Sequence, residues 1–249
     1  MYITILEKFK SNMPKKIPFE LFNLHYQKDS RFIEDKLTDK EFYLNYLRLI
    51  FNKRKFESHD FFNPEILIEC LPNIKLKDGY TLDFVYQTAN RIGLPLLYVR
   101  KVETEPFIKV TQHENWLKKN SLLDYILLDG TKDSYIQIII FMELGDKFFL
   151  YEHALYNKID LILSIKDFND IFKEYNFILE PNEREKLSNI NFNPNVEFLD
   201  EDEVKVSYYT FTEFGGLIEK QKIFTNESKL VLKLEFEKHI LNFNSGVMY

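Results

Sequence analysis

The stretch from residue 204 to residue 236 constrains the fold most, because it holds three strand-like segments joined by short turns. The segments are 204–214, 217–225 and 229–236, and Gly215-Gly216 separates the first two. Parallel strands need a crossover of a dozen or more residues, so segments this close in sequence pair as antiparallel neighbours. We therefore predict that the C-terminal half is mainly an antiparallel sheet.

The last of these segments alternates between apolar and mainly polar side chains. The two sets are Leu230, Leu232, Leu234 and Phe236, and opposite them Val231, Lys233, Glu235 and Glu237. Consecutive side chains of a strand point to opposite faces. The pattern therefore predicts that the first set packs on a core and that the second set meets water.

Helix signals precede this sheet. The spacing of apolar residues and the capping residues predict helices over 39–52, 80–92, 111–117 and 164–175. Further strands are predicted over 96–100, 125–128, 135–143 and 147–155. Together these elements predict an α+β fold, with an antiparallel meandering β-sheet in the C-terminal half covered by helices from the N-terminal half. We expect a single domain over 1–249, with a helical N-terminal lobe over 1–76 and an α+β core with the antiparallel sheet over 77–249.

The segment FFLYEHALY, at 148–156, has the composition of a buried strand but carries Glu152 and His153 side by side. Because consecutive strand residues face opposite ways, these two side chains are not predicted to act together on one substrate. A two-residue turn at Gly145-Asp146 would pair this strand with 135–143 in a hairpin.

On the face of that hairpin that carries Glu152, the nearest polar side chains are Gln137 and Tyr135. A carboxylate among aromatic rings has a raised pKa and can act as an acid or a base. Glu152, Gln137 and Tyr135 are therefore the catalytic candidates, and the alternative is a structural hydrogen-bond network.

Composition predicts a folded, aromatic-rich protein of the cytoplasm. The hydrophobic fraction is 45%, and the chain has 24 Phe and 15 Tyr. Cys70 is the only cysteine, so one chain can form no internal disulfide, and its apolar neighbours predict a buried structural thiol. No stretch approaches the roughly 20 apolar residues that cross a bilayer, and the N-terminus lacks the apolar core of a signal peptide. We therefore expect no membrane association.

The common signatures of catalysis and nucleotide binding are missing. The sequence has no GxGxxG, GxxxxGK[ST], GxSxG or HExxH motif. Its five histidines share no spacing typical of metal ligands, so neither a metal site nor a cofactor is predicted.

The run YILLDGTKDS, at 125–134, resembles the phosphatase loop of the haloacid dehalogenase fold at its Asp-Gly-Thr. That loop needs two acidic groups two residues apart, and Leu127 and Thr131 flank Asp129 at those positions. It is also followed by a helix, whereas the next segment here is predicted to be a hairpin. We therefore interpret Asp129-Gly130-Thr131 as a turn, in which Asp129 accepts hydrogen bonds from its own loop.

The net charge of −6 is unevenly distributed. Residues 1–55 carry 12 Lys and Arg and 7 Asp and Glu, a net of +5, and the rest of the chain carries −11. Lys53-Arg54-Lys55 follows a predicted helix, where cations complement the helix dipole, so we expect no nucleic-acid partner. The most acidic stretch is predicted to be either a solvated loop or a patch that steers a basic protein partner, and it comprises Glu197, Asp200, Glu201, Asp202 and Glu203.

Two functions from different classes fit these observations. The first is a non-catalytic, acidic protein-binding module, such as an inhibitor or a toxin-neutralising immunity protein. The second is an enzyme, for instance a hydrolase, with a site around Glu152. A tight cluster of polar groups in a deep pocket would favour the enzyme, and an exposed acidic or aromatic patch without a pocket would favour the binding module. The sequence specifies neither the partner nor the oligomeric state.

Overall fold

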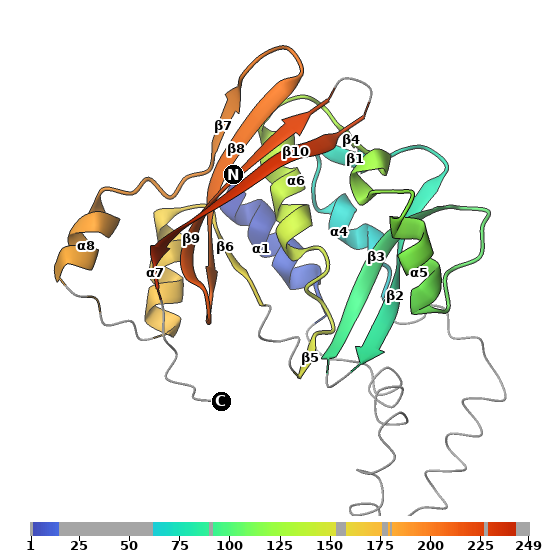
Figure 1. The fold of residues 1–249 in the computed structure, drawn as a ribbon, viewed down its shortest axis with the longest axis horizontal. Coiled ribbons are helices and arrows are strands. Elements are labelled where there is room, and N and C mark those ends of the chain that lie inside the picture. Colours follow the sequence, from blue (N-terminus) through green and yellow to red (C-terminus); the bar gives the residue numbers. More distant parts are fainter. Residues whose placement is uncertain are drawn as a thin grey trace, which may run out of the picture.

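The computed structural model describes residues 2–14, 62–89, 92–152, 158–175, 179, 181–226 and 229–242. Figure 1 shows their helices and strands, which follow one another in the order α1 (Tyr2–Asn12), α4 (Glu65–Glu69), β1 (Ile74–Leu76), β2 (Tyr80–Ala89), β3 (Ile92–Lys101), α5 (Val110–Leu117), the 3₁₀ helix η2 (Leu122–Tyr125), β4 (Ile126–Leu128), α6 (Lys132–Leu144), β5 (Tyr151–Glu152), β6 (Asp160–Ile162), α7 (Ile165–Glu174), α8 (Pro181–Ser188), β7 (Asn195–Phe198), β8 (Glu203–Thr212), β9 (Gly216–Thr225) and β10 (Val231–Leu241). The predicted helix over 39–52 and the basic cluster after it lie outside the described residues.

The C-terminal half forms an antiparallel sheet, as predicted. Its strands run in the order β10-β9-β8-β6, and β7 also pairs with β8. The turn between β8 and β9 falls at the predicted glycines, and Gly216 has φ 71°, in the left-handed region that favours glycine. Because all the strand pairs of the described chain are antiparallel and helices accompany them, the α+β class is confirmed.

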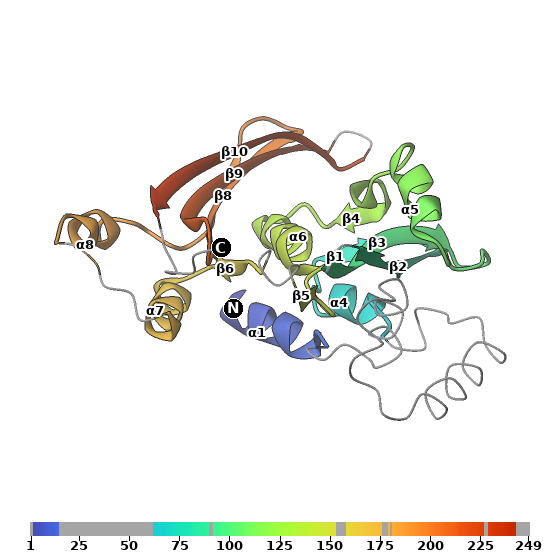
Figure 2. The ribbon, with the colours of Figure 1, turned by 60° about the horizontal axis from the view of Figure 1, so that its bottom comes forward.

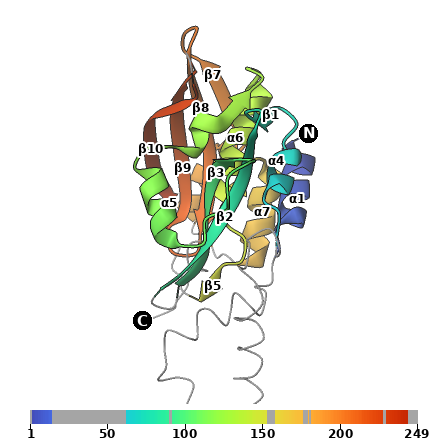
Figure 3. The same ribbon diagram turned by 90° about the vertical axis from the view of Figure 1, so that its right-hand side faces the viewer.

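The predicted helix over 80–92 is wrong, because residues 80–89 form the strand β2 and Ile92 begins the strand β3. The two strands pair over their whole length, from Tyr80 opposite Lys101 to Ala89 opposite Ile92. Residues 81–85 are buried on both faces of β2, because α5 covers one face of the hairpin and α4 the other (Figure 3). A strand buried on both faces shows no polar alternation, and its apolar residues matched a helical spacing by coincidence.

Residues 135–143 do not form a strand of the predicted hairpin but most of helix α6. Thr131 caps this helix, since its hydroxyl accepts a hydrogen bond from Ser134 N at 3.3 Å. The helix is buried on nearly all sides, including at the isoleucines 136, 138, 139 and 140. A helix that is apolar on all sides shows no helical spacing of polar and apolar residues in its sequence. Its isoleucines are typical of strands, so the sequence predicted a strand.

Helix α6 lies at the centre of the molecule. In Figure 2 strands β8 to β10 arch over one side of α6, and α1 and α4 lie on its other side. One core cluster therefore joins α1, α4, the β2–β3 hairpin, α6 and the inner face of the C-terminal sheet. A second cluster lies under α7 and α8 and includes Phe168, Phe192, Phe211 and Leu217.

Strand β10 contains a β-bulge that overturns the predicted alternation. Leu232 pairs with Phe224, but Leu234 pairs with Ile223, so Lys233 is an extra residue between them. An extra residue reverses which face the following side chains occupy. Leu234 and Phe236 consequently face outward, 44% and 52% exposed.

The apolar faces of the predicted elements also predict six core residues, and the structure divides these six into two groups. Phe141, Phe149 and Phe168 are buried as predicted, whereas Trp116, Phe172 and Leu232 are only partly buried at the edges of the two clusters. Cys70 is a buried free thiol, as predicted, and its sulfur accepts a hydrogen bond from Asn12 on α1 at 3.2 Å.

Phe149 anchors the segment between α6 and β5. It has φ 52°, which is uncommon for a bulky residue, and its carbonyl accepts a hydrogen bond of 2.6 Å from Tyr86 Oη. Its ring packs against Phe62, Phe84 and Phe148. The buried ring and the hydrogen bond hold this backbone conformation in place.

Replacing Phe149 with alanine should lower the free energy of unfolding by about 3–5 kcal/mol, because it leaves a cavity in this aromatic cluster. Phe236→Ala provides the matched control, since it removes the same atoms from an exposed site and should cost less than about 1 kcal/mol. Denaturant titrations measure both values. Equal losses would show that Phe149 is not a core residue.

Candidate functional site

The described part of the molecule offers one uncovered sheet surface, which we call the outer face. It is the side of strands β7 to β10 that points away from α6. Cross-strand pairing places Glu197, Lys205, Ile223 and Leu234 in one row of it, and Asn195, Ser207, Gln221 and Phe236 in the next. Toward the other end of the sheet this side is covered by α7 and α8. The uncovered part therefore combines three apolar side chains, those of Ile223, Leu234 and Phe236, with polar neighbours.

A hollow of about 330 Å³ lies beside Phe236 on this face. Its walls are Glu219, Gln221, Phe236, Glu237 and Lys238. Lys238 Nζ is 3.9 Å from Glu219 Oε2, and the lysine side chain is 75% exposed, so this ion pair is weak. The hollow thus offers an aromatic ring and a carboxylate with a weakly held counter-ion.

The predicted acidic stretch lies at the tip of the β7–β8 connection, at the end of the outer face. Glu197 pairs with Lys205 at 2.6 Å, and this interaction lowers the pKa of Glu197. Glu203 pairs with Lys233, the bulge residue. Asp200, Glu201 and Asp202 remain as exposed carboxylates without an ion pair among the described residues.

Asp200 also shapes this tip, because its Oδ1 accepts hydrogen bonds from the backbone N–H groups of Asp202 and Glu203, at 2.9 and 2.7 Å. The tip is therefore an ordered turn that holds the three carboxylates at one end of the outer face.

The three catalytic candidates do not share the predicted hairpin face, because that hairpin is absent. Tyr135 points from α6 toward the C-terminal sheet, where its ring meets Phe198 and Phe224. Gln137, two residues along the helix, is fully buried and exchanges hydrogen bonds of 2.6 and 2.8 Å with Asn73. Glu152 pairs through its backbone with Ile92 in β3, and its side chain lies outside the described residues.

Gln137 belongs to a hydrogen-bond network that fixes the start of α6. Asn73 Nδ2 donates to Asp129 Oδ2 at 2.6 Å, and Asp129 Oδ1 accepts from both the backbone and the hydroxyl of Thr131. Desolvation would raise the pKa of Asp129, but the hydrogen bonds from Thr131 and Asn73 lower it to about 2. The predicted turn at Asp129 is thus confirmed, although a helix follows it and not a hairpin.

A buried cluster of charges, which the sequence did not reveal, joins α6 to the inner face of the sheet. Glu143 is 5% exposed, and its carboxylate lies 3.2 Å from Lys220 Nζ and 3.2 Å from Lys222 Nζ. It also accepts a hydrogen bond of 2.6 Å from Tyr208 Oη. Burial would raise the pKa of Glu143, but the two lysines and the tyrosine together lower it. Burial and the nearby Glu143 carboxylate raise the pKa of Tyr208, so this hydroxyl stays protonated.

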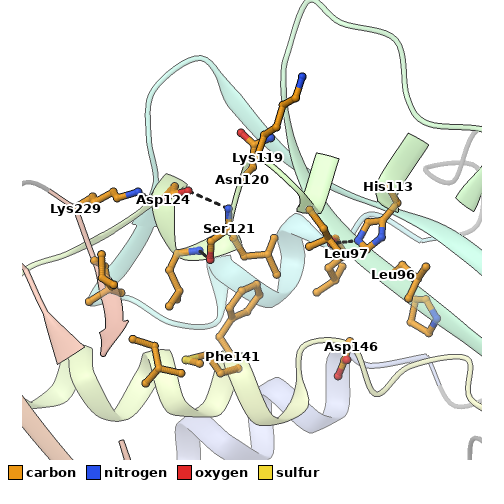
Figure 4. Close-up of a pocket in the computed structure, with 18 residues that line it drawn as sticks. Leu96, Leu97, His113, Lys119, Asn120, Ser121, Asp124, Phe141, Asp146 and Lys229 are labelled. Carbon is orange, nitrogen blue, oxygen red and sulfur yellow. Dashed lines mark hydrogen bonds and ion pairs between the residues drawn. The ribbon is translucent and has the colours of Figure 1, made fainter. Parts of the chain in front are cut away.

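A cleft of about 660 Å³ opens between the β2–β3 hairpin with α5, helix α6 and the start of β10 (Figure 4). Most of its lining is apolar and includes Leu97, Leu123, Phe141, Met142 and Leu232. Phe141 points into it from α6, and the Asp124–Lys229 ion pair of 2.7 Å and His113 lie at opposite ends.

Several polar groups of the cleft have hydrogen-bond partners, whereas the buried Oδ1 of Asp146 has none among the described residues. His113 Nε2 is 3.0 Å from the Leu97 carbonyl, and Asp124 Oδ2 accepts from Ser121 N at 2.9 Å. Asn120 accepts a hydrogen bond from Tyr125 Oη at 2.6 Å. The cleft is thus an apolar site with a few polar side chains at its edges, and it lacks the tight polar cluster that would favour an enzyme.

Buried charges elsewhere in the described chain are also paired. They are Asp83, Glu143 and Lys222, and Asp83 Oδ2 lies 2.9 Å from Arg100 Nε. Among the described residues, no group of three or more His, Cys, Asp and Glu side chains is placed to hold a metal ion. None of the described helices combines the length and the apolar character needed to cross a membrane. Comparisons with protein-family models, with curated proteins and with solved structures find no match.

Breaking the buried charge cluster should destabilise the protein. Lys222→Met leaves Glu143 with one lysine, and the loss of a partner from a buried ion pair costs about 3–5 kcal/mol. Lys238→Met, on the neighbouring strand and 75% exposed, should cost less than about 1 kcal/mol. Urea titrations of both variants test this, and a loss below about 1 kcal/mol for Lys222→Met would contradict a structural role of the cluster.

Burial lowers the pKa of His113 below its usual value, although the Leu97 carbonyl and Glu114 act in the opposite direction. The protonated form therefore favours the unfolded chain, so the contribution of His113 to stability is present above the unfolded pKa of about 6.5 and is lost as the pH falls. His113→Gln keeps a donor for Leu97 but cannot titrate. The variant should lose less stability than the wild type between about pH 7.5 and pH 5.5, and equal losses in urea titrations would contradict the assignment.

Proposed function

We propose that this protein is a non-catalytic binding module that recognises a basic protein partner through its outer face. The observation that carries the proposal is the hollow beside Phe236 on an uncovered sheet face. Exposed apolar patches rimmed by polar side chains are typical of protein–protein contact sites. An inhibitor or a toxin-neutralising immunity protein would use a surface of this kind.

The chemistry of the hollow indicates the kind of side chain it accepts. A lysine or arginine of the partner can lay its aliphatic stem on the Phe236 ring and bring its cation to Glu219. Leu234 and Ile223, one row away, provide further apolar contact beside it. Aromatic residues in such positions often dominate the binding energy of an interface.

The acidic tip contributes mainly to the rate of association. The unpaired carboxylates of Asp200, Glu201 and Asp202 give one end of the outer face a negative field. Such a field accelerates the encounter with a cationic partner more than it tightens the final complex. It also weakens as salt rises, because the Debye length falls from about 10 Å at 0.1 M to about 3 Å at 1 M.

Affinity capture from the native cells, with the wild type and two variants in parallel, tests the proposal. Phe236→Asp places a charge in the hollow and should weaken binding of the partner at least about tenfold, as at an interface hot spot. Ile165→Asp is the matched control, because Ile165 is equally exposed, 57% against 52%, and lies on α7. A partner that the wild type and Ile165→Asp retain and Phe236→Asp loses supports the proposal. A partner that all three retain equally contradicts it.

Once a partner is isolated, association rates measured at several salt concentrations test the role of the tip. Replacing Asp200, Glu201 and Asp202 with their amides should slow association and flatten its dependence on salt. Unchanged rates and slopes would show that the tip is only a solvated turn.

A further inference from the structure

The cleft between the hairpin and β10 has the size and the lining of a small-molecule site, and the outer face plays no part in it. Its volume of about 660 Å³ falls within the range of about 300–1,000 Å³ of ligand pockets. Elements that are far apart in sequence supply its apolar walls, among them β3, α6 and β10. An apolar ligand would bury its surface against leucine, phenylalanine and methionine side chains from all three.

The charges at the mouth of the cleft are not balanced. Lys119 and Lys229 both belong to its lining, and Asp124 is the acidic residue at that end. Lys77 also lies near, since its charge acts together with Lys229 to lower the pKa of the Asp124 carboxyl. Lys229 and Lys77 thus act on one carboxylate, and Lys119 is a further lysine of the lining, in a chain whose net charge is −6.

The remaining acid of the lining does not offset this excess. Asp146 lies at the other end of the cleft, away from Asp124 and Lys229 (Figure 4). Lys147 Nζ is 3.0 Å from Asp146 Oδ1, although the geometry is not that of a hydrogen bond. A charged group of a ligand at the Asp124 end of the cleft therefore meets more positive than negative charge.

We infer that the cleft binds a molecule with one aliphatic chain and an anionic head group, the chemistry of a long-chain carboxylate. The chain lies along Phe141, Met142 and Leu232. The head group remains at the mouth, where Lys229 contacts it. Because Phe236 lies on the opposite side of the sheet, this site is independent of the proposed protein-binding surface.

Dodecanoate is the probe, and dodecanol and dodecyltrimethylammonium are its neutral and cationic analogues. Isothermal titration calorimetry should give a dissociation constant for dodecanoate below about 100 µM, with octanoate at least about tenfold weaker because it buries fewer methylene groups. Dodecanol should bind more weakly, and dodecyltrimethylammonium weakest of all. The fluorescence of Trp116, the single tryptophan of the chain, provides a second readout, since its ring lies 6.1 Å from that of His113 in the cleft wall.

Two kinds of variant assign the binding to the cleft. Lys229→Gln should weaken dodecanoate about two- to fivefold, as expected for an exposed charge contact, and leave dodecanol unchanged. Lys158→Gln is its matched control, because Lys158 is also 52% exposed and ion-paired, to Asp160 of β6 and Glu174 of α7. Met142→Trp fills the cleft and should reduce binding at least about tenfold. Leu117→Trp blocks the cleft from an exposed position of α5, which keeps the test valid if Met142→Trp does not fold.

Several outcomes would overturn the inference. One is the absence of dodecanoate binding at about 1 mM. Another is equal affinity for the anionic and the cationic probe, and a third is binding that neither cleft-filling tryptophan reduces. Phe236→Asp should bind dodecanoate like the wild type, so failure of this inference and failure of the protein-binding proposal can be told apart.

Discussion

The position of helix α6 against the C-terminal sheet depends on the ion pairs and the hydrogen bond of the buried Glu143 carboxylate. This carboxylate stands near the end of α6 and is held by Lys220 and Lys222 of β9 and by Tyr208 of β8. A charge this deep is stable only where ionic partners and hydrogen bonds replace its water. Apolar contacts alone tolerate small shifts between a helix and a sheet. The ion pairs and the hydrogen bond of Glu143 therefore specify the position of α6 more narrowly than packing does.

The same cluster accounts for the bulge in β10. Lys220 and Lys222 need more negative charge than Glu143 supplies, and Glu237 and Glu235 provide it from the neighbouring strand. With uninterrupted alternation these two glutamates would face outward, and Leu234 and Phe236 would face inward. The extra residue Lys233 reverses both pairs. One inserted residue thus gives the buried lysines their carboxylate partners and places the side chains of Leu234 and Phe236 on the outer face.

The sequence predicted correctly the elements that have one buried and one solvent-exposed face, or a clear capping residue at one end. The strands β8 and β9, the helix α5 and the helix α7, which Ser164 caps, were all found in this way. It failed for β2 and α6, which are buried all round, because burial on every side removes the polar half of the pattern. Tertiary packing then outweighs intrinsic propensities of at most about 1 kcal/mol per residue.

The functional surfaces were partly visible in the sequence. The acidic stretch from Glu197 to Glu203 was found because its charges are contiguous, and the turn around Asp200 orders it. The hollow at Phe236 and the cleft were not found. The first depends on a bulge, and the second on residues from several elements that are distant in sequence. No local pattern in the sequence indicates either one. Lys220 and Lys222, however, share one face of β9 with the apolar Ile218 and Phe224, which is a signal that buried carboxylates lie nearby.

The outward orientation of Leu234 and Phe236 is tested most directly by thiol labelling. Cys70 is buried and is the only native cysteine, so the background reaction is slow. With Leu234→Cys and Phe236→Cys introduced singly, both new thiols should react with a soluble disulfide reagent within about tenfold of their rates in the denatured chain, as exposed thiols do. Protection of both thiols to the level of Cys70 would place them in the core and would contradict the bulge, the outer face and the function proposed for it.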